Sequence, residues 1–222
     1  MSRTDAIANA HQLIASGEFL KILDRRVGYK TESQNAVRAG ELRAYLEKEM
    51  QPAFAELDFE SRLVESPSGK SPFLVAEHRE GASLPTVLIY GHGDVVDGMA
   101  GEWRDGLDPF KTTRIDNRVY GRGTADNKGQ HSINLAALRA VRDARGGKLG
   151  FNAKFLVEMG EEIGSPPIVR LFSSVAAAAS AFTSMWSCAK VGTIPAIGAA
   201  CSPTPPPSLR MRSHRSSTAM GE

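Results

Sequence analysis

Acidic residues are absent from one long part of this chain. Of the 25 Asp and Glu among 222 residues, 24 lie in residues 1–162, and the last is Glu222. Seven of the 12 prolines and both cysteines fall in residues 163–222, the same acid-poor stretch. The composition therefore changes just after Glu162, and we expect the chain to consist of two unlike parts.

Two further scarcities exclude whole classes of protein. Two cysteines cannot build a disulfide framework, and there is no run of about 18 apolar residues to form a transmembrane helix. Residues 1–15 also lack the apolar core of a signal peptide. A net charge of +2 provides no drive toward nucleic acid or an anionic membrane. We therefore expect a reduced, cytoplasmic protein without nucleic-acid or membrane partners.

Apolar periodicity predicts two helices near the N-terminus. The first covers residues 5–24, although Gly17 weakens it. The second covers residues 33–50, with a cap in 33–35 and a stop at Pro52. Its apolar residues are predicted to point inward, and they are Val37, Leu42, Leu46 and Met50.

Four segments are predicted to be strands: residues 57–64, 73–77, 86–90 and 152–158. The third of them, TVLIY, is a continuous apolar run and predicts a central strand buried on both faces. A helix is predicted from Asn127 to the glycines 146–147. Its inward face is expected to consist of Ile133, Ala136, Ala137, Ala140, Val141 and Ala144. Strands alternating with helices predict an α/β fold with a mixed sheet.

Two polar segments follow these predicted strands, and a third follows a short extended piece, Val119–Tyr120; open α/β sheets place their sites at strand ends. They are GHGDVV with His92 and Asp94, GRGTADNKG with Asp126, and EMGEEIGS with Glu161 and Glu162. Each alone is also explained by structure: a polar loop, a helix N-cap and a solvated charge pair. Together these imidazole and carboxylate groups form a donor set suited to Zn²⁺.

The glycines of these segments do not form a nucleotide-binding pattern. A GxGxxG would need glycine where Val96 and Asp126 stand, and the chain has no GxxxxGK[ST].

The three segments, in this order over residues 87–165, resemble the motifs of the M20 metallopeptidases. That family includes acetylornithine deacetylase, succinyl-diaminopimelate desuccinylase, aminoacylases, carboxypeptidase G and dipeptidases. The resemblance implies a three-layer zinc-exopeptidase-like mixed sheet flanked by helices. It also implies hydrolysis of amide bonds in small peptides or N-acyl amino acids, two Zn²⁺ ions with Co²⁺ as an alternative, and frequent homodimers.

The resemblance implies a role for each polar residue of the motifs. His92 would bind one metal and be oriented by Asp94. Asp126 would bridge both metals and be followed by a cis peptide bond to Asn127. Glu162 would bind the second metal.

The catalytic base implied by the resemblance is Glu161. It would pass the proton of a metal-activated water to the leaving nitrogen. Trp103, the segment 108–110 and Arg122 are expected to shape and brace the site instead of reacting.

The chain departs from the family after about residue 166. The family has a further acidic ligand, a lid domain and a late His, whereas the acid-free stretch offers only His214, within a proline-rich segment predicted to be disordered. We therefore expect residues 1–166 to be the N-terminal part of a catalytic domain. Residues 167–222 are expected to be a non-family tail, produced by a shift of reading frame.

Two interpretations of function stay open. The first is a metal-dependent amide hydrolase with carboxypeptidase- or deacetylase-like chemistry. The second is an inactive truncated fragment without two complete metal sites, whose sheet would have an open edge. Two tightly bound metal ions per chain would favour the enzyme.

Overall fold

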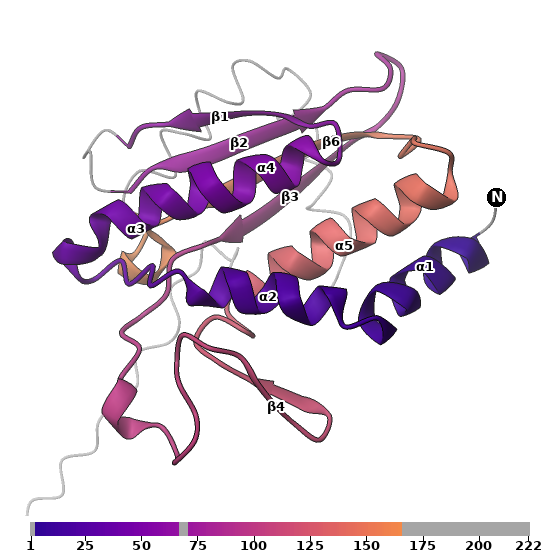
Figure 1. Cartoon of the computed structure of the whole chain (residues 1–222). Helices are drawn as coiled ribbons and strands as arrows, with labels where there is room; N and C mark the ends of the chain where they lie inside the picture. Colours follow the sequence, from indigo (N-terminus) through magenta and orange to yellow (C-terminus); the bar gives the residue numbers. More distant parts are fainter. Residues whose placement is uncertain (1–2, 67–70, 166–222) are drawn as a thin grey trace, which may run out of the picture. The chain divides into compact units, whose positions relative to one another are not determined.

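The computed structural model describes residues 3–66 and 71–165. Its main sheet has four strands and is mixed, and the arrangement of these strands is drawn in Figure 1. The strands lie in the order β1-β2-β6-β3. β1 pairs antiparallel with β2, β2 antiparallel with β6, and β3 parallel with β6. Their bounds are Glu60–Val64, Phe73–His78, Thr86–His92 and Asn152–Glu158 for β1, β2, β3 and β6. The predicted tail, residues 167–222, lies outside the described residues.

Helices pack on the sheet, so the predicted α/β class is confirmed. They are α1 (Arg3–Ala15), α2 (Glu18–Gly28), α3 (Ala39–Ala44), α4 (Gln51–Ala55) and α5 (Lys128–Ala144). A 3-10 turn, Ala36–Arg38, precedes α3, and a π-helical stretch, Tyr45–Met50, joins α3 to α4. None of the helices in this part of the chain is long and apolar enough to cross a membrane.

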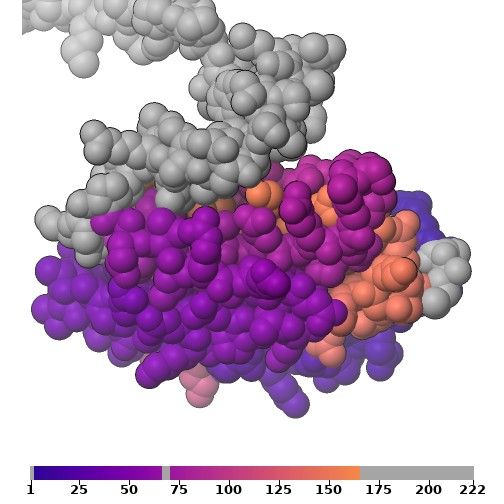
Figure 2. All heavy atoms as spheres, turned by 90° about the horizontal axis from the view of Figure 1, so that it is seen from above, coloured from indigo at the N-terminus to yellow at the C-terminus, as the bar shows by residue number. Residues whose placement is uncertain are grey.

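Alternate residues of β6 build the hydrophobic core. Ala153, Phe155 and Val157 are buried in one cluster with residues of α3, α4 and α5. The rings of Phe54 and Phe155 meet edge to face with centroids 5.1 Å apart. Seen from above, the segment from α3 to β2, coloured purple, forms much of the described surface (Figure 2).

The first predicted helix is two helices. Gly17 adopts a left-handed backbone conformation with φ of 76°, and α1 ends and α2 begins on either side of it. Glycine has no Cβ to oppose this conformation, which terminates a helix.

The second predicted helix begins where predicted but continues past its predicted end. The Asn35 side chain caps it by accepting from the N–H of Val37. Val37 itself is 88% exposed, so its predicted inward position is wrong. Pro52 lies in the first turn of α4, directly after the π-helical stretch, and the chain stays helical to Ala55, so the predicted stop at Pro52 is wrong. The remaining predicted core positions, Leu42, Leu46 and Met50, are buried.

The TVLIY strand lies at an edge of the described sheet and not at its centre. In the part of the chain that the structure describes, β3 pairs only with β6, and Val87 and Tyr90 are 42% and 41% exposed. The central strands are β2 and β6. A continuous apolar run predicts that a strand is buried, but it does not predict how many neighbouring strands pair with it.

The inward face of α5 is only partly as predicted, because Ala140 and Ala144 are buried but Ala137 is exposed. Ile133 is 58% exposed, while His131, Ser132 and Leu135 are buried. The two polar residues have partners inside: His131 Nε2 lies 2.5 Å from the Tyr45 hydroxyl, and Ser132 Oγ accepts from Arg26. Apolar periodicity missed this face because part of it is polar.

Candidate metal centre

The ends of β3 and β6 bring two of the three motifs together. His92 ends β3 and lies opposite Glu158, which ends β6 in the parallel ladder. The chain then leaves both strands at the same edge of the sheet, and the N–H of Gly93 donates to the carbonyl of Glu158 at 2.8 Å. Glu161 and Glu162 follow in a 3-10 turn, Glu161–Ile163.

His92 is buried between carboxylates. Its Nδ1 lies 3.1 Å from the backbone carbonyl and 3.4 Å from Oδ1 of Asp94. Its Nε2 faces the opposite way, 2.9 Å from Oδ1 of Asp126 and 3.8 Å from Oε2 of Glu161. One ring nitrogen is thus held by the protein, and the other points at the carboxylates predicted to surround a metal.

Asp94 is fully buried and contacts both motifs. Besides its contact with His92, its Oδ1 accepts from the N–H of Glu161 at 3.3 Å, and its Oδ2 from the N–H of Glu162 at 3.1 Å. The sequence predicted the contact with the imidazole alone. This one carboxylate therefore fixes the start of the turn that carries the Glu pair.

The donor atoms fit a small divalent cation. One donor atom each from His92, Glu161 and Glu162 lie within 4.8 Å of one another. Bonds of about 2.0–2.2 Å to an ion separate its donors by at most roughly 4.4 Å, so a small inward movement suffices. Asp126 is not part of this group of three; its Oδ1 lies beside the group, 2.9 Å from His92 Nε2.

Asp126 does not act as an N-cap. The N-cap position of α5 belongs to Asn127, without a side-chain capping bond, and the Asp126–Asn127 peptide bond is cis, as the resemblance implied. The Asp126 side chain is exposed at the site. Asn127 Oδ1 accepts from the N–H of His92 at 3.3 Å, which ties the end of β3 to the start of α5.

An N-terminal segment that no motif marked also supports the site. The Thr31 hydroxyl donates to the carbonyl of Gly93 at 2.6 Å, and the Thr31 backbone carbonyl accepts from the N–H of Val95. Gln34 donates to the carbonyl of Glu162 at 3.3 Å. These contacts join positions far apart in the sequence, and single polar residues in a loop gave no signal for them.

The predicted bracing residues contact one another. The Arg122 guanidinium lies over the ring of Trp103, 5.9 Å from its centroid, and Trp103 donates to the carbonyl of Gly98 at 2.7 Å. The N–H of Arg122 donates to the carbonyl of Pro109. The loop after β3 is thereby attached to the hairpin of β4 (Thr113–Ile115) and β5 (Arg118–Tyr120).

The carboxylates change the proton affinity of His92. Burial lowers the pKa of His92, but Asp94, Asp126 and Glu161 together outweigh burial and raise it from 6.5 to about 9. Burial raises the pKa of Glu162, an effect that the nearby His92 opposes.

The raised pKa predicts a pH-dependent stability of the metal-free chain. Because the folded pKa lies above the unfolded one, protonated His92 stabilises the fold fully below pH 6.5, and this contribution is lost as pH rises through about 9. Lys128, whose pKa burial lowers to about 7, acts oppositely over an overlapping range. We therefore compare urea unfolding of wild type and His92→Gln in EDTA. Their difference in unfolding free energy should shrink from pH 6.5 to 9, and parallel profiles would contradict the prediction.

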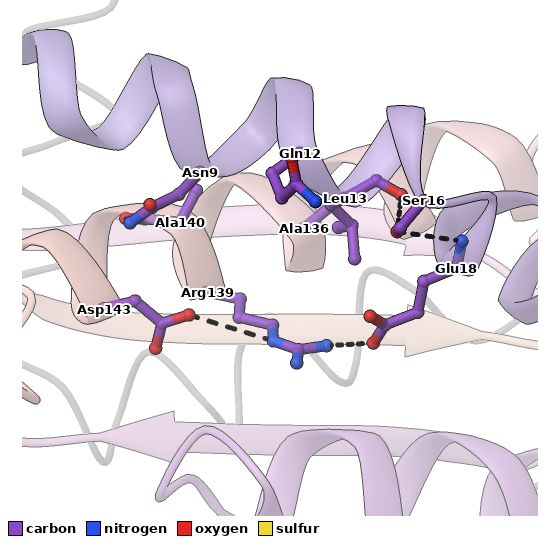
Figure 3. A pocket seen from close by; sticks show the side chains of 9 residues that line it. All are labelled: Asn9, Gln12, Leu13, Ser16, Glu18, Ala136, Arg139, Ala140 and Asp143. Carbon is purple, nitrogen blue, oxygen red and sulfur yellow. Dashed lines mark hydrogen bonds and ion pairs between the residues drawn. The ribbon is translucent and has the colours of Figure 1, made fainter.

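A separate hollow of about 290 Å³ lies between α1 and α5 (Figure 3). Its Arg139 donates to Glu18 at 2.7 Å and lies 3.9 Å from Asp143. Since two carboxylates already neutralise this guanidinium, we assign the hollow no role in the site.

Known proteins share the motif region of this chain. The sequence model of peptidase family M20/M25/M40 matches residues 88–198, half of the chain. The succinyl-diaminopimelate desuccinylase of Methylobacterium radiotolerans is 42% identical over 84 residues, 38% of this chain and 21% of that protein. The Beta-Ala-His dipeptidase of Mus musculus is 40% identical over 106 residues, 45% of this chain and 20% of that protein. The matches thus span about a fifth of each relative.

The fold is similar to that of solved peptidases. Human carnosine dipeptidase 1 matches with a TM-score of 0.62 and 28% sequence identity, over 75% of this chain and 37% of that one. The described architecture is therefore part of a larger known fold.

Proposed function

Because this chain belongs to peptidase family M20/M25/M40, we propose that it contributes to metal-dependent hydrolysis of amide bonds in small peptides or N-acyl amino acids. The observation that carries the proposal is the convergence of His92, Glu161 and Glu162 within 4.8 Å, with Asp126 beside them. Zinc, a second metal ion, homodimerisation and a cytoplasmic location belong to the proposal. So does the domain boundary near residue 166, which lies inside the matched range 88–198.

The proposed division of labour follows the positions of the side chains. His92, Asp126 and Glu162 would hold metal, and Asp94 would orient His92. A bound divalent ion would polarise the amide carbonyl and acidify a water molecule. Glu161, whose side chain is exposed beside His92, would take the water proton at Oε2 and deliver it to the leaving nitrogen.

Two substitutions test this division. In the full chain, Glu162→Gln should weaken binding of Zn²⁺ or Co²⁺ in calorimetry. Glu161→Gln should leave metal affinity near that of wild type and slow any hydrolysis of dipeptides or N-acyl amino acids about 10²–10⁴-fold, the usual contribution of a general base. Glu102→Gln, on an exposed turn, is the matched control.

The outcomes separate the alternatives. Equal losses of metal affinity in both variants would make Glu161 a ligand and contradict its role as base. Two bound ions per wild-type chain with hydrolysis would support the enzyme. One weakly bound ion or none, without hydrolysis, would support the non-catalytic fragment.

A further inference from the structure

Glu158 is a buried carboxyl group without a cationic partner among the described residues. It is fully buried at the end of β6. Its Oε1 accepts from the Tyr90 hydroxyl and from Ser165 Oγ, the latter at 2.9 Å. Its Oε2 is buried and has no hydrogen-bond partner within residues 3–66 and 71–165. A buried carboxylate costs stability unless a cation or several donors compensate it, so stability does not explain this residue.

The two partners of Glu158 flank the candidate ligands. Tyr90 lies two residues before His92 on β3, and His92 is directly opposite Glu158 in the ladder. Ser165 lies three residues after Glu162. Glu158 thus connects the strand that carries the imidazole with the far end of the turn that carries both carboxylates.

The turn between Glu158 and Ser165 is closed by its own backbone. The N–H of Ser165 donates to the carbonyl of Gly160 at 2.8 Å, and the N–H of Gly164 donates to that of Glu161 at 2.8 Å. Asp94 holds the start of this turn, as described above, and the Ser165–Glu158 bond holds its end. The turn is therefore attached at two points, at the Glu pair itself and at Ser165.

We propose that Glu158 is a positioning residue, which sets the placement of Glu161 and Glu162 relative to His92 at a cost in stability. This inference rests on the proposed metal-dependent function. Metal ligands must be held within about 0.5 Å of their binding geometry, and the residues that hold them typically change metal affinity about 10- to 100-fold. Glu158 can hold the ligands in this way because its hydrogen bonds reach both β3, through Tyr90, and the end of the Glu turn, through Ser165.

The test separates positioning from a structural role. Glu158→Leu keeps approximate volume and removes both hydrogen bonds. It should weaken Zn²⁺ binding to the full chain about 10- to 100-fold, while the metal-free protein melts no lower than wild type because a buried carboxyl is gone. Glu158→Gln retains Oε1 as an acceptor and should restore most of the affinity. Tyr90→Phe and Ser165→Ala should each give part of the loss.

A control variant, Glu77→Leu, and a second measurement, amide hydrogen exchange, complete the test. Glu77→Leu makes the same change on β2, where Glu77 pairs with Lys154, and should not alter metal affinity. In metal-free protein, amide hydrogen exchange of residues 159–165 should accelerate in Glu158→Leu and stay unchanged elsewhere. Unchanged affinity and unchanged local exchange would overturn the proposal, as would lower affinity with a parallel fall in melting temperature. If wild type bound no Zn²⁺, the proposed function would fail, and exchange alone would decide the positioning role.

Discussion

Replacing Asp94 with alanine is expected to reduce divalent-metal affinity more than about 100-fold, beyond the 10- to 100-fold typical of one supporting residue. Asp94 supports three candidate site residues at once: it contacts His92 Nδ1 and accepts the N–H groups of Glu161 and Glu162. Alanine leaves the imidazole with only the backbone carbonyl of residue 94 at Nδ1, and it releases the start of the Glu turn. Competition with a chromophoric chelator would measure the loss.

Asp97→Ala is the matched control for this prediction. Asp97 lies three residues further along the same loop, is exposed, and accepts only from the N–H of Met99 in its recorded hydrogen bonds. Asp94→Asn should be intermediate, because one amide oxygen can still accept while the amide nitrogen opposes the second N–H. An affinity of Asp94→Ala equal to that of Asp97→Ala would show that the buried carboxylate does not organise the site.

The second large effect is expected for stability: Glu49→Ala should lower the free energy of unfolding by about 3–5 kcal/mol, the usual result of removing one partner of a buried ion pair. Glu49 accepts from Arg25 at 2.6 Å and from Arg26 at 3.0 Å. Arg26 is buried and its other recorded partner is the neutral Ser132. Removing Glu49 leaves the guanidinium of Arg26 inside the protein without its counter-charge.

Urea unfolding of three variants would measure this. Glu47→Ala removes a carboxylate from an exposed pair with Arg43 on the same helical stretch and should cost less than about 0.5 kcal/mol. The double variant Arg26→Met/Glu49→Met should be more stable than Glu49→Ala, because no charge remains buried. Equal losses in Glu47→Ala and Glu49→Ala would refute the argument. Since small domains are stable by about 5–15 kcal/mol, Glu49→Ala could leave little folded protein.

Patterns confined to neighbouring residues were predicted well. The strand at residues 152–158 matches β6, and the one at 73–77 matches β2 except for its last residue. The helix predicted from Asn127 is α5, which starts one residue later. These elements follow from side-chain periodicity and from the glycines that end them, which are properties of a short stretch of chain.

The polar site residues were predicted for a related reason. His92 and Glu161 were found because His92 ends β3 and Glu161 comes three residues after the end of β6, and parallel strands end at one edge of a sheet. This rule on strand ends therefore predicted that His92 and Glu161 lie near each other, although they are far apart in the sequence. The roles of these residues as ligand and base remain proposals.

The sequence by itself determined where most strands and helices lie, and which polar groups stand near the strand ends. Only the tertiary structure decided which faces are inward, that β3 lies at the edge of the described sheet, and that Asp94 and Glu158 hold the two ends of the Glu turn. The physical reason is distance along the chain: periodicity and turn residues act within a few positions, whereas Asp94 meets the N–H of Glu162 across 68 positions. Such contacts depend on how whole helices and strands pack, and no pattern of neighbouring residues in the sequence predicts them.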